Sequence, residues 1–190
     1  MNEYIEALPS GYDQFSYDVD VKDFENSPYR QKEKLRKKFA FAIPTTYALQ
    51  DILDVGDEVV EIGAGTGYWS YLLDQMGATV RAYDSGSWSG YFDGEPWFEV
   101  KRGGPGMIRH YPNAVVLIVW PPYDRPMAFE VAKRIRVGQV LVYVGEGSGG
   151  CTGCDKFFGL LESDFERVGG CGIPQWWGLH DHMDIYRREH

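Results

Sequence analysis

Two short, continuously apolar runs constrain the fold of this chain more than any other feature of its sequence. The runs VVLIV, at 115–119, and VLVYV, at 140–144, carry no polar group apart from one tyrosine hydroxyl. Such a run is typical of a parallel strand buried on both faces, whereas a strand with one solvated face alternates apolar and polar residues. The sequence therefore predicts a parallel sheet that is covered by helices on both sides.

Further β-like runs alternate with stretches of helical periodicity. The predicted strands cover 58–62, 79–83, 98–101, 114–120 and 139–144. The predicted helices between them cover 68–76, 127–135 and 155–162. The alternation is typical of a doubly wound, mostly parallel α/β fold with right-handed crossovers. The last β runs, 165–170 and 183–188, have no helix between them, which predicts an antiparallel hairpin at one edge of the sheet.

The N-terminal region has a different composition. Residues 1–27 are acidic, rich in Tyr and Asp and interrupted by Pro and Gly, which predicts an irregular arm of low helical content. Helices are predicted at 29–42 and at 44–53, with Pro44 in the first turn of the second. We expect an N-terminal arm and helix at 1–43, which could act as a lid, and one α/β domain at 44–190.

Charge and composition limit the classes of function. The formal net charge of −9 argues against a broad nucleic-acid interface, and the basic cluster at 30–38 is predicted to be a solvated helix face. No apolar run approaches the roughly 20 residues of a membrane helix, and no secretory signal is visible. Three cysteines do not suggest a disulfide framework. We expect a cytoplasmic protein without a nucleic-acid or membrane partner; its oligomeric state is left open.

A glycine-rich turn follows the strand at 58–62 and leads into a helix. The turn reads Glu61-Ile-Gly63-Ala-Gly65-Thr-Gly67, and Asp84 stands directly after the next predicted strand. Glycines let the backbone approach a ligand closely, and the helix N-terminus adds free N–H groups. An acidic residue at the tip of the second strand is placed to accept hydrogen bonds from ribose hydroxyls. The pattern predicts a cofactor with a ribose, although such turns also occur without ligands.

The spacing of the turn separates several nucleotide motifs. A dinucleotide fingerprint needs its third glycine where this chain has Tyr68, and the Gly-Lys-Ser/Thr of a P-loop is missing. The G-x-G-x-G spacing preceded by Glu61 resembles motif I of the class I S-adenosylmethionine (SAM)-dependent methyltransferases. This resemblance implies that Glu61 helps to hold the cationic methionine end of SAM and that the glycines pass beneath its sugar and methionine.

A wider resemblance covers residues 43 to 189, approximately. The stretches AIPTTYAL, EIGAGTGYW, GGPGM, VWPPYD, VYVGEGSGGCTG and IPQWWGLHD resemble a group of small methyltransferase-like proteins of bacteria and their phages. The resemblance implies a Rossmann-like fold and SAM as the cofactor. It implies no particular substrate.

The segment Trp120-Pro121-Pro122-Tyr123-Asp124 follows the strand at 114–120, at the carboxyl end where α/β proteins bind ligands. It resembles the Asn/Asp-Pro-Pro-Tyr motif of amino-directed methyltransferases, which accepts hydrogen bonds from the target NH₂ and stacks an aromatic ring on the target. The resemblance implies that Trp120 and Pro121 lie at the cofactor and that Tyr123 and Asp124 lie beside the acceptor. Trp120 departs from the motif because an indole only donates, although the Pro121 carbonyl could still accept. Alternatively, the prolines only end the strand and Trp120 belongs to the core.

Weaker patterns lie in the C-terminal third. His180 is a candidate general base, with an ordinary loop histidine as the alternative. Cys151 and Cys154 form a C-x-x-C pair, but no second pair completes a zinc site, so no metal is expected. The glycine-rich segment 145–150 is predicted to be mobile and to border the substrate pocket.

Six tryptophans are many for a chain of this length, and some must belong to the core. Trp88 and Trp176, in predicted loops, could form a wall of the pocket. The sequence as a whole predicts a SAM-dependent methyltransferase that acts on a small molecule or protein. The alternatives are a SAM-binding protein with another activity, such as SAM cleavage or sensing, and a non-catalytic binding module.

Overall fold

The computed structural model describes residues 2–9, 12, 28–87 and 90–190. Its seven strands are β1 (Glu58–Ile62), β2 (Thr79–Asp84), β3 (Val100–Arg102), β4 (Val115–Val119), β5 (Val140–Gly145), β6 (Phe165–Gly172) and β7 (His182–Arg188). They form one sheet of order β3-β2-β1-β4-β5-β7-β6. The first five strands are parallel, and β7 runs antiparallel to both β5 and β6. The predicted doubly wound sheet with its C-terminal antiparallel hairpin is confirmed.

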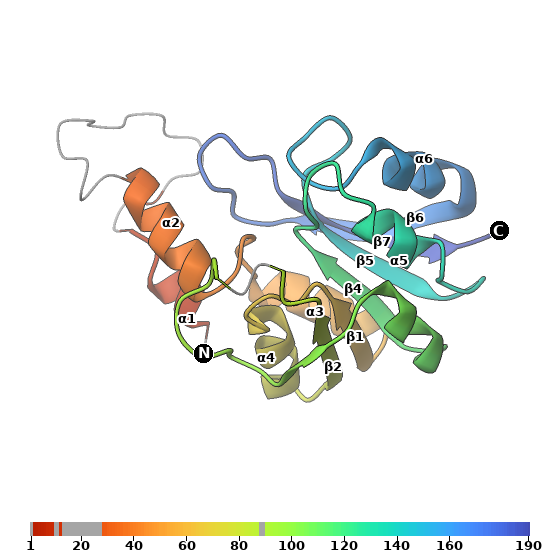
Figure 1. Cartoon of the computed structure of the whole chain (residues 1–190), viewed down its shortest axis with the longest axis horizontal. Coiled ribbons are helices and arrows are strands. Elements are labelled where there is room, and N and C mark those ends of the chain that lie inside the picture. Colours follow the sequence, from red (N-terminus) through yellow and green to blue (C-terminus); the bar gives the residue numbers. More distant parts are fainter. Residues whose placement is uncertain (1, 10–11, 13–27, 88–89) are drawn as a thin grey trace.

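Helices cover both faces of the sheet (Figure 1). One face packs against α3 (Thr46–Val55) and α4 (Tyr68–Gln75), and the other against the 3-10 helix η1 (Pro105–His110), α5 (Met127–Ala132) and α6 (Asp155–Asp164). Strand β4 shows why its sequence is wholly apolar. Its side chains point alternately into the two cores, and all five residues are buried.

Several element boundaries differ from the predicted ones for local reasons. Pro44 does not begin a helix, because Thr45 is the N-cap of α3 and its hydroxyl oxygen accepts a hydrogen bond from the Ala48 amide at 3.1 Å. Helix α2 (Pro28–Lys38) ends before residue 42, since Phe39 turns into the core. Strand β3 starts two residues later than predicted, and α5 ends at Ala132 rather than at residue 135.

The described part of the N-terminal arm contains one helical turn, α1 (Glu3–Glu6), where the sequence predicted an irregular segment. Tyr4 is fully buried and stacks on Phe39 with ring centroids 4.9 Å apart. The indole N–H of Trp176 donates to the Tyr4 hydroxyl at 3.0 Å. These residues belong to the same apolar cluster as α3, α4 and the sheet. That the segment 1–43 acts as a lid stays a prediction.

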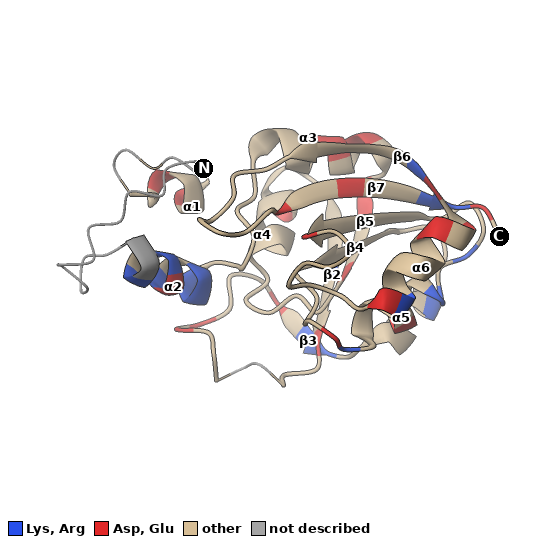
Figure 2. Ribbon diagram, turned by 90° about the horizontal axis from the view of Figure 1, so that it is seen from above, with Lys and Arg blue, Asp and Glu red and all other residues tan. Residues whose placement is uncertain are grey.

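Helix α2 lies beyond the carboxyl-terminal ends of the parallel strands (Figures 1 and 2). Figure 2 shows that much of this helix is coloured as Lys or Arg, in line with its sequence PYRQKEKLRKK. None of the helices within the described ranges is long and apolar enough to cross a membrane.

Candidate functional site

A cavity of about 690 Å³ lies at the carboxyl-terminal edge of the sheet, within the size range of small-molecule pockets. It is lined by the glycine turn after β1, by the end of β2 and by the segment after β4. Strands β1 and β4 are neighbours in the sheet but not in the sequence, so the cavity lies where the strand order reverses. Ligands of open α/β sheets bind at this switch point.

Six of the ten predicted site residues line the cavity: Glu61, Gly63, Gly65, Asp84, Trp120 and Tyr123. The other four do not: Gly67, Pro121, Asp124 and His180. The residues brought together come from three loops that are far apart in the sequence. The structure therefore places the glycine turn, the acid after β2 and the Trp-Pro-Pro-Tyr segment around one space.

Glu61 presents a buried carboxyl group to this space. It is 2% exposed, and the Ser70 hydroxyl donates to its Oε2 at 2.5 Å. Burial raises its pKa to about 7, because ionisation is costly away from water, although the hydrogen bonds from Ser70 act in the opposite direction. A cationic ligand in the cavity would favour the ionised form.

Asp84 ties the end of β2 to the glycine turn. Its Oδ2 accepts a hydrogen bond from the Gly65 amide at 3.1 Å, and its Oδ1 accepts one from the Gly86 amide at 2.6 Å. Each carboxylate oxygen has further lone pairs. Asp84 can therefore hold the turn and still accept hydrogen bonds from a ligand.

Two glycines of the turn serve different purposes. Gly65 has φ +55°, and a Cβ there would lie 2.8 Å from the Cζ of Phe92. The ring of Phe92 thus lies directly over the turn. Gly67 has φ +73°, and a Cβ there would lie 2.9 Å from side-chain atoms of both Phe98 and Val100. Gly67 lets the chain that enters β3 pack against the turn and does not face the cavity.

Four aromatic side chains, Phe41, Tyr91, Phe92 and Trp120, form what we call the aromatic wall. Phe41 stacks on Tyr91 and on Trp120, each at 5.0 Å between centroids and with interplanar angles of 16° and 14°. Phe92 meets Phe41 edge to face at 5.9 Å. Phe41, Phe92 and Trp120 line the cavity. The wall joins the end of the N-terminal region to the β2–β3 loop and to the segment after β4.

Arg36 packs behind the aromatic wall. Its guanidinium carbon lies 4.2 Å from the centroid of Phe41 and 4.7 Å from that of Trp120. The residue is 8% exposed, so the prediction of a solvated face for 30–38 is wrong at this position. The reason is that two rings offer the guanidinium a favourable cation–π surface.

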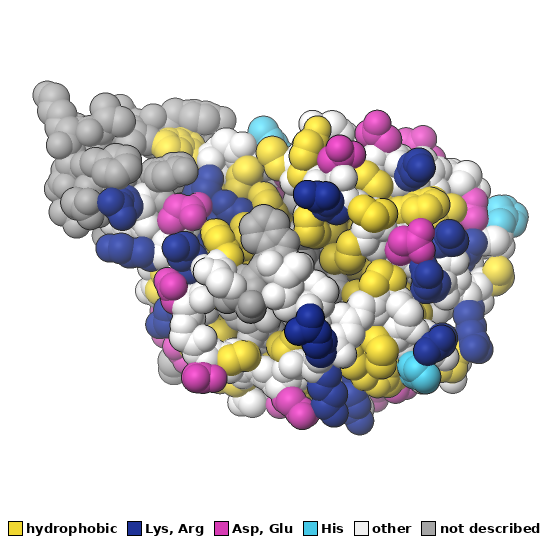
Figure 3. Space-filling view, viewed as in Figure 1, with side chains coloured by type: hydrophobic (Ala, Val, Ile, Leu, Met, Phe, Trp, Pro, Cys, Tyr) yellow, Lys and Arg dark blue, Asp and Glu magenta, His cyan; other side chains and the backbone are white. Residues whose placement is uncertain are grey.

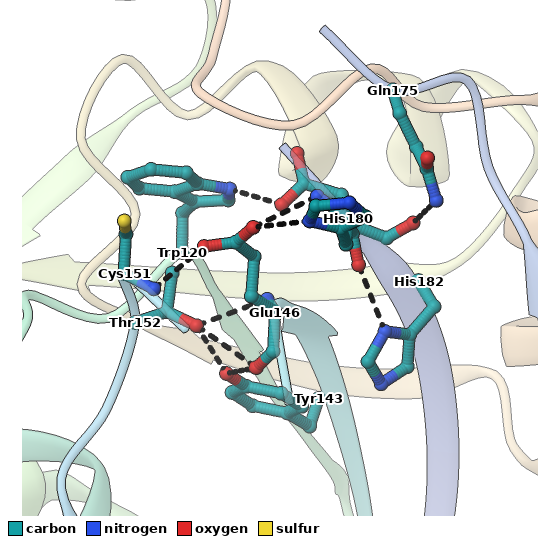
Figure 4. Close-up of polar contacts among 9 residues, drawn as sticks. Trp120, Tyr143, Glu146, Cys151, Thr152, Gln175, His180 and His182 are labelled. Atoms are coloured by element: carbon teal, nitrogen blue, oxygen red, sulfur yellow. Dashed lines mark hydrogen bonds and ion pairs between the residues drawn. The ribbon is translucent and has the colours of Figure 1, made fainter. Parts of the chain in front are cut away.

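Trp120 is held by a partner far away in the sequence. Its indole N–H donates to Asp181 Oδ1 at 2.7 Å (Figure 4). Asp181 is fully buried, which raises its pKa to about 6 even though the bond from Trp120 lowers it. The other oxygen, Oδ2, has no hydrogen-bond partner among the described residues. The indole N–H is therefore used by Asp181 and is not available to bind a substrate.

The carbonyl of Pro121 is also in use. It accepts a hydrogen bond from the Gly153 amide at 3.2 Å, and the Asp124 amide donates to the Gly153 carbonyl at 2.7 Å. These bonds join the segment after β4 to the loop that precedes α6. Trp120 offers no side-chain oxygen to an amino substrate, and the Pro121 carbonyl, whose residue lies outside the cavity lining, already accepts one hydrogen bond.

Glu146 organises the loop after β5 (Figure 4). It is 4% exposed and accepts hydrogen bonds from the amides of Cys151 at 2.6 Å and His180 at 2.8 Å. Burial opposes its ionisation, yet these bonds hold its pKa below the ordinary value. The segment predicted to be mobile is thus fixed at Glu146, and Cys151 reaches the cavity. The His180 imidazole lies 3.4 Å from Glu146, is 78% exposed and lies outside the lining.

Several functional candidates were missed in the sequence. Asp181, Phe41 and Phe92 gave no local signal, because their roles depend on contacts with distant segments. Trp176 was predicted to be a pocket wall, but it is 3% exposed and packs in the core against Tyr4. Trp88 lies outside the described residues.

No metal-binding cluster of three or more His, Cys, Asp or Glu side chains occurs in the part of the chain that the structure describes. The cysteines Cys151, Cys154 and Cys171 are free thiols.

The comparisons with known proteins concern the fold. No protein-family model matches the sequence, and no curated protein matches it. The chain is similar to the N-methyltransferase NodS from Bradyrhizobium japonicum WM9, solved in complex with S-adenosylhomocysteine (TM-score 0.51, 12% identity, all of both chains covered). It is also similar to TehB from Haemophilus influenzae (TM-score 0.51, 11% identity, 83% of this chain and 67% of that chain). An rRNA methylase from Streptococcus thermophilus matches less closely (TM-score 0.45, 16% identity, 76% and 96% covered). The chain therefore has an α/β fold that is also found in an N-methyltransferase.

Proposed function

We propose that this protein is a SAM-dependent methyltransferase that acts on a small-molecule acceptor. The observation that carries the proposal is the pair of carboxyl groups, Glu61 and Asp84, at a cavity on the switch point of the sheet. The spacing of the glycine turn supports SAM over a dinucleotide. The shared fold is consistent with this function and does not select a substrate.

The residues at the cavity fit SAM in their chemistry. The methionine ammonium group would stabilise the buried Glu61 carboxyl group as an anion. Such a cation would offset the burial that raises the pKa of Glu61. Asp84 has lone pairs left for two ribose hydroxyls. Gly63 and Gly65 of the glycine turn line the cavity, and the ring of Phe92 lies over Gly65.

SAM, when bound, supplies a methyl group on a sulfonium that is open to in-line attack. The contribution of the protein is to place the acceptor and to remove water from between the reactants. The aromatic wall would exclude water, and Tyr123, which lines the cavity with 67% of its surface exposed, would stack on a flat acceptor at the mouth. No histidine lines the cavity within the described ranges, so we assign His180 no proton transfer.

A second candidate is a SAM-binding protein that cleaves or senses SAM without methyl transfer. The Trp120 indole, which donates to Asp181, favours it, because the segment after β4 lacks the side-chain oxygen at the first position of the motif it resembles. Incubation with SAM distinguishes the two. A transferase leaves S-adenosylhomocysteine, whereas cleavage leaves methylthioadenosine and homoserine lactone.

Binding of SAM is the first test. We expect titration calorimetry to show binding that weakens by roughly tenfold or more in Asp84→Asn, since a charged hydrogen-bond partner of the ribose is worth about 1.5–3 kcal/mol. The matched control is Asp54→Asn, which changes an exposed carboxylate on α3, bonded only to Gln50 within the described residues. If the unaltered protein does not bind SAM, the proposed function and its rival both fail.

A further inference from the structure

The order of the strands divides the cavity into two halves. The ends of β1 and β2 contribute the carboxyl groups of Glu61 and Asp84. The segments after β4 and β5 contribute what we call the acceptor half, lined by Val119, Trp120, Pro122, Tyr123, Arg125 and Cys151. The two halves differ in charge as well as in position.

Arg125 is the only cationic side chain among the described residues that line the cavity. The acceptor half also contains the Cys151 thiol, whose pKa is raised by burial and by the neighbouring Glu146 carboxylate. That thiol stays uncharged near neutral pH. The cavity therefore has carboxyl groups in one half and a guanidinium in the other.

The guanidinium of Arg125 has no ion pair or hydrogen bond with any residue the structure describes. Two arginines outside the cavity are engaged by contrast: Arg167 pairs with Asp184 at 2.6 Å and Arg188 with Asp164 at 3.0 Å. A guanidinium presents a planar set of N–H donors that matches a carboxylate or a phosphate. Arg125 is thus free to bind an anionic group of a ligand.

The acceptor half also carries aromatic rings. Trp120 stacks on Phe41, which lines the cavity next to it, and the ring of Tyr123 is exposed. Figure 3 shows hydrophobic side chains reaching the surface between α2 and the helices α5 and α6. Aromatic walls favour a planar ligand through stacking.

Helix α2 brings cations near the aromatic wall, although the whole chain carries a formal charge of −9 and Glu33 of the same helix accepts a hydrogen bond from the Tyr91 hydroxyl. Two cations of helix α2, Arg36 and Lys37, lie against rings of the aromatic wall. Lys37 Nζ lies 5.6 Å from the ring centroid of Tyr91, a member of that wall. Local potential at a cleft depends on such nearby charges more than on the net charge.

We infer that the acceptor half binds a planar aromatic molecule that carries a carboxylate or phosphate, with Arg125 as the partner of the anionic group. This inference rests on the proposed function in one respect, which is that SAM occupies the half with the carboxyl groups. It narrows the acceptor to a small aromatic acid and makes Arg125 a specificity-determining residue.

The test uses three simple probes with the full-length protein, in the presence and absence of S-adenosylhomocysteine. The probes are 4-hydroxybenzoate, phenyl phosphate and the neutral 4-hydroxybenzamide, and binding is followed by ligand-observed NMR. We expect one of the two anions to bind about five- to tenfold more tightly than the amide, as a charge-assisted hydrogen bond provides. The anion that binds more tightly identifies carboxylate or phosphate as the group that is recognised.

Variants of Arg125 complete the test. Arg125→Gln should remove the preference for the anion and leave binding of the amide unchanged, and Arg125→Lys should keep part of the preference. The matched control is Arg136→Gln, an exposed arginine in the turn before β5, outside the cavity lining. Because Arg125 is exposed, both variants should keep the melting temperature of the parent protein.

Failure of this inference and failure of the proposed function give different results. Equal binding of anions and amide, no binding of any probe, or an anion preference that survives in Arg125→Gln would each overturn the inference, even if SAM binds. Anion binding that depends on Arg125 in a protein without affinity for SAM would support the subsite and reject the methyltransferase.

Discussion

The β1–β2 end of the cavity and its β4–β5 end share one sheet edge but are held together by different kinds of contact. Glu61 is bonded to a serine nine residues away, and Asp84 to an amide nineteen residues away. At the other end, Trp120 is bonded across 61 residues to Asp181, and Glu146 across 34 residues to His180. The first end is built from neighbouring segments, whereas the second needs the C-terminal part of the chain to be in place.

The difference shows which changes should affect which property. A carboxyl group in the first end acts on a cofactor directly, so its loss should appear in SAM affinity. The bonded pair Trp120–Asp181 in the second end acts inside the protein, so its loss should appear in stability. The side chain of Tyr123 is largely exposed, so its loss should affect only the binding of the acceptor.

The largest effect is expected for Glu61→Gln. Removal of the carboxylate should weaken SAM binding by about a hundredfold, since leaving a buried charge without its partner costs about 2–5 kcal/mol. The same variant should make the ligand-free protein more stable at pH 8, by about 1–3 kcal/mol, because a buried carboxyl group with a raised pKa opposes folding when it is ionised. Calorimetry and urea unfolding measure the two opposite effects.

The pH dependence of the unaltered protein checks this assignment. The folded-state pKa of Glu61 lies near 7, above its ordinary value of 4.5, so its unfavourable contribution to stability grows from pH 4.5 to pH 7 and is constant above. SAM affinity should rise about fivefold between pH 6 and pH 7 as the carboxyl group ionises, and Glu61→Gln should lack this rise. A SAM affinity that is equally pH-dependent in both proteins would remove Glu61 from the site.

A smaller effect, on stability alone, is expected for Trp120→Phe. The substitution removes the indole N–H and leaves the buried Asp181 carboxylate without a donor, which should cost about 1–3 kcal/mol at pH 8. The loss should shrink below pH 6, where Asp181 takes up a proton. The double variant Trp120→Phe, Asp181→Asn serves as the control and should recover stability. An unchanged melting temperature at pH 8 would show that the bond is not structural.

The smallest change in stability is expected for Tyr123→Ala. The side chain is 67% exposed, so the free energy of unfolding and SAM affinity should stay within about 0.5 kcal/mol of those of the parent. Transfer to a true acceptor should fall, while Tyr123→Phe should keep most of it because stacking needs only the ring. A parallel loss of stability and SAM affinity would instead give Tyr123 a structural role.

Much of the first end could be predicted from the sequence, and little of the second. The spacing of Glu61, Gly65 and Asp84 is local, so a strand–turn–helix pattern was enough to bring them together. The role of Asp181 could not be predicted from its neighbours in the sequence. Its partner Trp120 directly follows β4, and two strand pairings, β4–β5 and β5–β7, bring the two residues together.

Side-chain packing explains the other misses. Nothing in a basic stretch indicates that Arg36 faces two rings, and nothing in a glycine-rich loop indicates that Glu146 is buried. The sheet was predicted because apolar runs and crossovers are properties of single segments and their order. Burial of a charged side chain depends on what packs over it, which no single segment specifies.

The hydrogen bond between Trp176 and Tyr4 has a consequence for the folding of the chain during its synthesis on the ribosome. Tyr4 is synthesised 172 residues before one of its hydrogen-bond partners. A chain still attached to the ribosome through residues before 176 has no indole to donate to the Tyr4 hydroxyl, even if the glycine turn and β1 have already formed. Nascent chains stalled before and after Trp176 has left the exit tunnel should therefore differ in protease resistance near the N-terminus.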